Sequence, residues 1–118
     1  PAPASAPNGP RVRASVISGG GDVVSQVPIE KDGWRPVEGR GVLLRFYGAG
    51  LPVKVRVAER GERFLLSIDA QPWGQVTVDG RNMGPTPVAR VPVGEGAHRI
   101  TVLGEGQQEK VMKLELDR

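Results

Sequence analysis

His98 is the only histidine in the chain, and it is the first residue to consider for acid–base chemistry. A histidine that acts as a general base needs a nucleophile within reach and a carboxylate that orients its ring. His98 stands just after the glycine turn Gly94-Glu95-Gly96, where an apolar–polar alternation begins. A ring in that place commonly bonds to nearby backbone groups. We therefore expect a structural role for His98.

The carboxylates, serines and metal-ligand types give no better catalytic set. Asp69 and Asp79 stand on either side of Trp73 and could form an acid–base pair, but the turn signal Asp79-Gly80 already accounts for Asp79. The serines lie in linker, strand or turn contexts, without a nucleophile elbow. One histidine and no cysteine leave little support for a metal site. The sequence predicts a protein that is not an enzyme and that needs no metal or cofactor.

Two further kinds of ligand are disfavoured by composition. The glycine run at residues 19–21 is followed by neither Gly-Lys-Ser/Thr nor a helical pattern, so we expect a flexible turn and not a phosphate loop. The net charge is +3 without a basic cluster, whereas nucleic-acid binding needs a concentrated basic stripe. No apolar run approaches the length of a transmembrane helix. We expect neither nucleic-acid binding nor a membrane span in this fragment.

The elements that hold these residues follow a two-residue apolar period. Val53, Val55 and Val57, for example, alternate with charged residues, which is typical of a strand with one buried face. No segment holds a helical period, and turn signals recur along the chain. The sequence predicts an all-β fold, a small antiparallel, Greek-key-like β-sandwich of about nine short strands. The expected strands are residues 11–17, 23–29, 42–47 (a central strand), 53–58, 63–68, 75–78, 88–93, 98–103 and 112–116.

The chain is expected to form one domain with a tail. Residues 1–10 are rich in proline and alanine and contain no large apolar side chain, so we expect a disordered linker there. Residues 11–118 are expected to form a single sandwich, because about 48 residues before Phe64 make a poor core alone. The chain opens on Pro1 within this linker and has no initiator methionine, and we expect it to be a piece of a larger protein.

The two tryptophans are the candidate binding residues. Trp34 stands in a charged loop with Arg35 and Arg40, a composition that suits an interface anchor. Trp73 stands in a loop before the Val76 strand. Either ring could instead be a lid that closes the end of a thin sandwich, or could stack on a pyranose ring. The lid is favoured for Trp73, and both interpretations stay open for Trp34.

Several motifs follow one another around one predicted hairpin: Pro72-x-Gly74, Val76-x-Val78-Asp79-Gly80, Gly84-x-Thr86-Pro87, and Gly96-x-His98 with Ile100 and Val102. Together they resemble the bacterial PEGA domain over roughly residues 64–116. The order of the motifs is more specific than any one of them, although Trp73 and Gln75 replace the Glu and Ala of the family name. The resemblance implies a small β-sandwich module without known catalytic residues, found in serine/threonine kinases and envelope proteins. Its structural positions in this sequence are Pro72, Gly74, Asp79, Gly80, Gly84, Thr86, Pro87, Gly96 and His98.

We therefore expect a non-catalytic protein-interaction or spacer module of a larger bacterial kinase or envelope-associated protein. The alternative is a module that binds carbohydrate or peptidoglycan through an exposed tryptophan. The partner would be a protein or a cell-envelope polysaccharide, and the isolated domain is expected to be monomeric. A location on the periplasmic side of the envelope is favoured, with the cytoplasm as the other possibility.

Overall fold

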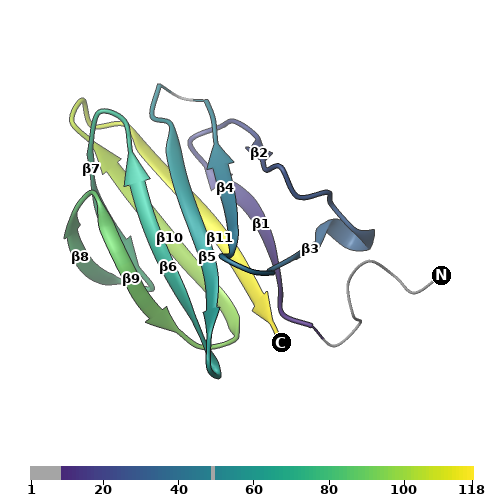
Figure 1. Cartoon of the computed structure of the whole chain (residues 1–118). Helices are drawn as coiled ribbons and strands as arrows, with labels where there is room; N and C mark the ends of the chain where they lie inside the picture. Colours follow the sequence, from purple (N-terminus) through teal and green to yellow (C-terminus); the bar gives the residue numbers. More distant parts are fainter. Residues whose placement is uncertain (1–8, 49) are drawn as a thin grey trace.

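The computed structural model describes residues 9–48 and 50–118, and these residues form an all-β structure of two antiparallel sheets (Figure 1). The expected linker, residues 1–10, falls largely outside the described part of the chain. One 3₁₀ turn, η1, is the only helical element among the described residues. The elements are β1 (Arg11–Ser18), β2 (Val23–Val24), η1 (Lys31–Gly33), β3 (Arg35–Pro36), β4 (Val42–Phe46), β5 (Val53–Arg60), β6 (Arg63–Ala70), β7 (Gly74–Val78), β8 (Arg81–Pro85), β9 (Val88–Val93), β10 (Gly96–Gly104) and β11 (Glu109–Asp117).

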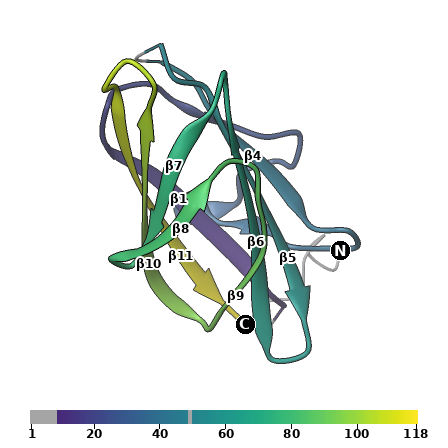
Figure 2. The same ribbon diagram turned by 90° about the vertical axis from the view of Figure 1, so that its left-hand side faces the viewer.

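The two sheets lie face to face and share both halves of the chain. The six-stranded sheet has the order β3-β1-β11-β10-β7-β8, and the five-stranded sheet has the order β2-β4-β5-β6-β9. Figure 2 shows them as separate layers, with β8 and β9 on the side that faces the viewer. The long pairs β1–β11 and β5–β6 join strands from the first half to strands from the second. One core cluster accordingly contains side chains from both halves.

The core follows from the alternation in the sequence. On β5, Val53, Val55 and Val57 are buried, while Lys54 and Arg56 between them are exposed. The same period buries one face of β4, β6, β10 and β11. The prediction of a sandwich built from alternating strands is therefore confirmed.

The structure differs from the expected strands in several places, and one of them is the short strand β3, which lies in a segment expected to be a loop. Residues 81–85, expected to be a loop, form β8, because Arg81 pairs with Val78 and Pro85 with Gln75. The residues after Val24 leave the sheet before Pro28, so β2 is a two-residue edge strand. β4, expected to be central, has only β2 beyond it, and β5 holds the central position of its sheet.

The glycine and threonine of the hairpin motifs hold the base of β7 and β8 together. The Gly74 N–H donates to the Thr86 hydroxyl at 3.0 Å, and the Thr86 N–H donates to the Gly74 carbonyl at 2.8 Å. A Cβ at position 74 would lie 2.5 Å from a methyl group of Val102, so this strand position accepts only glycine without rearrangement. Gly74 and Thr86 of the motif therefore have a structural role, which is to join β7 to β8.

The turn between β7 and β8 is a two-residue loop with positive φ at both positions. Asp79 has φ of 51° and Gly80 has φ of 84°, the combination required by a type I′ turn. No atom lies within 4 Å of a Cβ built on Gly80, so the conformation alone selects glycine there. The expected primed turn is confirmed.

Gly80→Val should destabilise the domain by roughly 1–3 kcal/mol, because a β-branched residue is strained at positive φ. Thermal melts of the two proteins measure this loss. Gly80→Asn is the matched control and should cost less, because asparagine tolerates the left-handed region. Equal losses for valine and asparagine would show that backbone conformation is not what position 80 requires.

Candidate functional site

Trp34 is already engaged inside the molecule. The guanidinium carbons of Arg11 and Arg13 lie 4.7 and 4.5 Å from the centroid of its ring, close enough for cation–π attraction. Both arginines also form ion pairs at 2.9 Å, Arg11 with Asp117 and Arg13 with Glu115. Trp34 is half-buried and lies outside the core cluster. The ring is therefore neither a core lid nor a free anchor, and it fixes the η1 segment to β1.

Arg35 and Arg40, predicted to stand beside Trp34 at a binding surface, do not share an environment. Arg35 is 4% exposed and its Nε atom has no hydrogen-bond partner among the described residues. Burial lowers the pKa of its guanidinium. Arg40 is exposed in the turn before β4. The structure does not bring these residues together into one site.

Trp73 lies in the loop between β6 and β7 with 40% of its surface exposed. It is not part of the core cluster. The core-lid interpretation favoured from the sequence is therefore not supported, because a ring that closed the core would be buried. Trp73 remains available at the surface.

The His98 ring links the β7–β8 turn to the β9–β10 turn through hydrogen bonds. Its Nδ1 lies 2.6 Å from a carboxylate oxygen of Asp79, and its Nε2 lies 2.7 Å from the Gly94 carbonyl. Both contacts are acceptors, so the arrangement suits a ring that donates from both nitrogens. The other Asp79 oxygen accepts the Arg99 N–H at 2.8 Å. No nucleophile appears among these contacts, which are those of a structural residue.

The Asp79 carboxylate should make stability fall in acid. Partial burial raises the pKa of Asp79. The hydrogen bonds from His98 and the Arg99 N–H lower the pKa by more than burial raises it, so the net pKa is below that of an ordinary aspartate. The unfolded chain then binds the proton more readily, so this contribution is complete above the ordinary aspartate pKa and is lost as the pH falls through the lowered pKa. Asp79→Asn, which keeps the turn, should melt with a shallower acid limb between about pH 2 and pH 5. An unchanged acid limb would contradict this role.

Lys110 is a buried cation that the sequence pattern did not reveal. It occupies the second position of β11, is 0% exposed, and donates from Nζ to the Gly48 carbonyl at 2.9 Å and towards the Phe46 carbonyl at 3.5 Å. Burial lowers the pKa of its ammonium group. The position follows the inward alternation of β11, which was the available signal. Its donors meet the backbone at the end of β4, so its role is to hold the sheets together.

The outer face of the five-stranded sheet carries three neighbouring cations. Arg45 lies directly opposite Lys54 in the β4–β5 register, and Arg56 follows on the same face of β5. None of the three side chains forms a hydrogen bond or an ion pair within the described residues. Like charges directly opposite on a sheet are destabilising. We name Arg45, Lys54 and Arg56 the cationic face.

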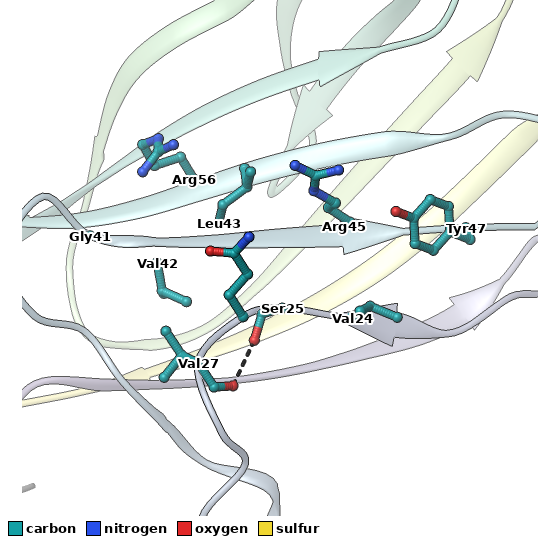
Figure 3. A pocket seen from close by; sticks show the side chains of 10 residues that line it. Val24, Ser25, Val27, Gly41, Val42, Leu43, Arg45, Tyr47 and Arg56 are labelled. Atoms are coloured by element: carbon teal, nitrogen blue, oxygen red, sulfur yellow. Dashed lines mark hydrogen bonds between the residues drawn. The ribbon is translucent and has the colours of Figure 1, made fainter. Parts of the chain in front are cut away.

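A hollow lies beside the cationic face, where β2 leaves β4. Its volume is about 430 Å³, and Figure 3 shows it between β4 and the segment that follows β2, with Arg45 and Tyr47 at one end. Ser25 donates to the Val27 carbonyl at 2.9 Å and thereby bends that segment. Exposed apolar groups adjoin the cations, since Tyr47 is 45% and Val24 47% exposed. Cations beside partly apolar, uncovered surface suit the binding of an anionic partner.

Part of this face is recognisable from the sequence pattern. Arg45 interrupts the most apolar segment, and Lys54 and Arg56 alternate with the buried valines of β5. Arg45 and Lys54 lie opposite each other only because of the register in which β4 and β5 pair, and the alternation alone does not determine that register.

The described residues contain no group of three or more histidine, cysteine or acidic side chains placed to hold a metal ion. In the same part of the chain, no helix has the length and apolarity needed to cross a bilayer.

Comparison with family models matches residues 63–118 to the family described as the PEGA domain, a family of non-catalytic accessory modules. No curated protein and no solved structure matches the chain significantly.

Proposed function

We propose, because residues 63–118 match the model of the PEGA domain family, that the chain is a non-catalytic interaction module whose cationic face binds an acidic partner protein. The family supports an accessory binding role. The residues before the match pair with it in both sheets, which supports a single domain of residues 11–118. We place this domain within a larger bacterial protein of the kinase-associated or envelope type.

The proposal rests on one observation. Arg45 and Lys54 lie directly opposite each other without an ion-pair partner, and Arg56 lies beside them on the same face of the sheet. A sheet face that served only the fold would gain from alternating charges across the strands. Asp69 stands opposite Lys54 on the other side, yet it forms no ion pair with Lys54 and accepts the N–H of Ala70 instead. The three cations are thus left for a partner that supplies carboxylates.

The test uses poly-L-glutamate as the anionic probe. Binding is followed at the amide resonances of β4 and β5, where the triple variant Arg45→Gln/Lys54→Gln/Arg56→Gln should show about tenfold weaker binding or worse, and binding by the wild type should weaken with salt. The matched control is Arg40→Gln/Arg60→Gln/Arg99→Gln, which removes the same charge from exposed positions elsewhere. Equal losses in the two triple variants would show that only net charge matters and would overturn the proposal.

A second candidate function rests on Trp73, whose 40% exposure leaves part of the ring free to stack on a sugar. Trp34 is a weaker candidate, since Arg11 and Arg13 already lie over its ring. Titration of tryptophan fluorescence with peptidoglycan fragments tests this alternative. A saturable change that disappears in Trp73→Ala would favour carbohydrate binding over the acidic partner.

A further inference from the structure

A second surface lies on the side of the sandwich where the sheets end at β8 and β9, the side that faces the viewer in Figure 2. A cleft of about 620 Å³ opens there between the two edge strands, and we name it the edge cleft. Its apolar lining includes Met83 of β8 and Val91 of β9, both partly buried against the core, together with Val93. The edge cleft shares no residue with the cationic face.

Three arginines from three different strands border this apolar lining. Arg63 lies at the start of β6, Arg81 at the start of β8 and Arg90 within β9, and all three are exposed. Their guanidinium groups form no hydrogen bond or ion pair within the described residues. Asp79 is the one carboxylate that lines the cleft, and it is held by His98. The edge cleft therefore combines an apolar floor with an excess of free guanidinium groups.

The backbone at Arg90 is held in an unfavourable conformation. Its φ is 59°, in the left-handed region that a side chain as long as arginine rarely adopts. The strain comes from a bulge in the β6–β9 pairing, where Ala89 and Arg90 together oppose Ser67, and the Arg90 N–H donates to the Ser67 hydroxyl at 3.2 Å. A bulge redirects the side chain that it carries, and such features concentrate at binding sites. Here the bulge carries Arg90 at the border of the edge cleft.

Both edge strands are poorly suited to pairing with an added strand. β8 contains a bulge opposite Val76 and Thr77 and ends at Pro85, while β9 contains its own bulge and Pro92. Proline and bulges are the devices by which sheets prevent edge-to-edge pairing. A ligand of this side must therefore be held through its side chains, by the apolar floor and the guanidinium groups, and not through a backbone ladder.

We propose that the edge cleft binds an acidic peptide segment of a partner protein that presents a bulky apolar residue between carboxylates. The apolar side chain lies on Met83 and Val91, and flanking carboxylates accept from Arg63, Arg81 and Arg90, for which the guanidinium geometry is well matched. Because the three arginines come from separate strands along an open cleft, they match charges spread along a chain better than one small head group. This proposal does not depend on the cationic face.

The test follows amide resonances of the full chain during titration with the peptide acetyl-Glu-Glu-Leu-Phe-Glu-Glu-amide. Shifts should concentrate at β8 and β9 and saturate with a Kd between about 10 μM and 1 mM. Replacing Leu-Phe of the peptide by Ala-Ala, or its glutamates by glutamines, should each weaken binding about tenfold or more. The absence of saturable binding up to about 5 mM would overturn the proposal.

Variants of the protein separate this site from the cationic face. Arg63→Gln/Arg81→Gln/Arg90→Gly should weaken binding of the peptide about tenfold or more, and glycine at position 90 suits the positive φ, so the fold is preserved. Arg45→Gln/Lys54→Gln/Arg56→Gln should leave the affinity for this peptide unchanged. Equal weakening by both triple variants, or full affinity in the first, would contradict the assignment whatever becomes of the cationic face.

Discussion

We expect Gly21→Ala to destabilise the domain by about 3 kcal/mol or more, because the added Cβ would overlap the carbonyl oxygen of Tyr47. Gly21 packs directly on the backbone that follows β4, and a Cβ on Gly48 would in turn lie 2.6 Å from the Gly21 Cα. The turn cannot move away easily, since a Cβ on Gly19 would lie 2.7 Å from the Glu109 carbonyl of β11. The glycine run is a close-packed junction between the two sheets.

The matched control for this prediction is Gly20→Ala. Gly20 also has positive φ, 70° against 98° for Gly21, but nothing lies within 4 Å of its Cβ position. Gly20→Ala should therefore lower the free energy of unfolding only by the conformational strain, about 1 kcal/mol. Chemical denaturation of the three proteins gives the comparison. If the two variants lose equal stability, the close contact with Tyr47 does not contribute and the turn is as flexible as the sequence suggested.

The second large effect is expected at Lys110. Lys110→Ala should cost about 2–4 kcal/mol, because it leaves a cavity and removes the donor from the Phe46 and Gly48 carbonyls. Lys110→Met fills the same volume without the charge and should cost less, about 1 kcal/mol or below. Equal losses for alanine and methionine would show that the ammonium group, and not the packing of the stem, provides the stability.

The charge of Lys110 also predicts a pH dependence with a definite sign. Burial lowers the pKa of the folded state, so between that pKa and the ordinary value of about 10.4 the unfolded chain binds more protons. The free energy of unfolding contributed by this residue therefore rises with pH across that interval. The rise should be absent in Lys110→Met, and an identical alkaline profile in the two proteins would contradict this.

Local patterns predicted the strands and turns but few of the strand pairings, because most contacts of this fold join residues that are distant in the sequence. The two-residue alternation of β5 and the Asp79-Gly80 turn are properties of neighbouring residues, and both are confirmed. β8 was missed because Arg81 to Pro85 is short, polar and bulged, and its pairing with β7 follows from the turn geometry and not from an apolar pattern. The role of the glycine run was missed because it depends on a contact with Tyr47, distant in the sequence.

The candidate site was less predictable for the same reason. Trp34 was expected to be either an anchor or a lid, but Arg11 and Arg13 from β1 lie over its ring. The opposition of Arg45 and Lys54 exists only once β4 and β5 are paired in register. Binding residues on a sheet face are thus determined by register, which a single sequence states only indirectly.

The central claim is that the cations of the five-stranded sheet are retained for a partner and not for the fold. It is tested most directly by the melting of Arg45→Gln/Arg56→Gln, which leaves Lys54 beside Asp69. Relief of the like-charge opposition should raise the free energy of unfolding by about 0.2–1 kcal/mol at low salt, with the difference fading as salt is added. A melting temperature clearly below that of the wild type would show that these cations stabilise the domain, and would contradict the claim.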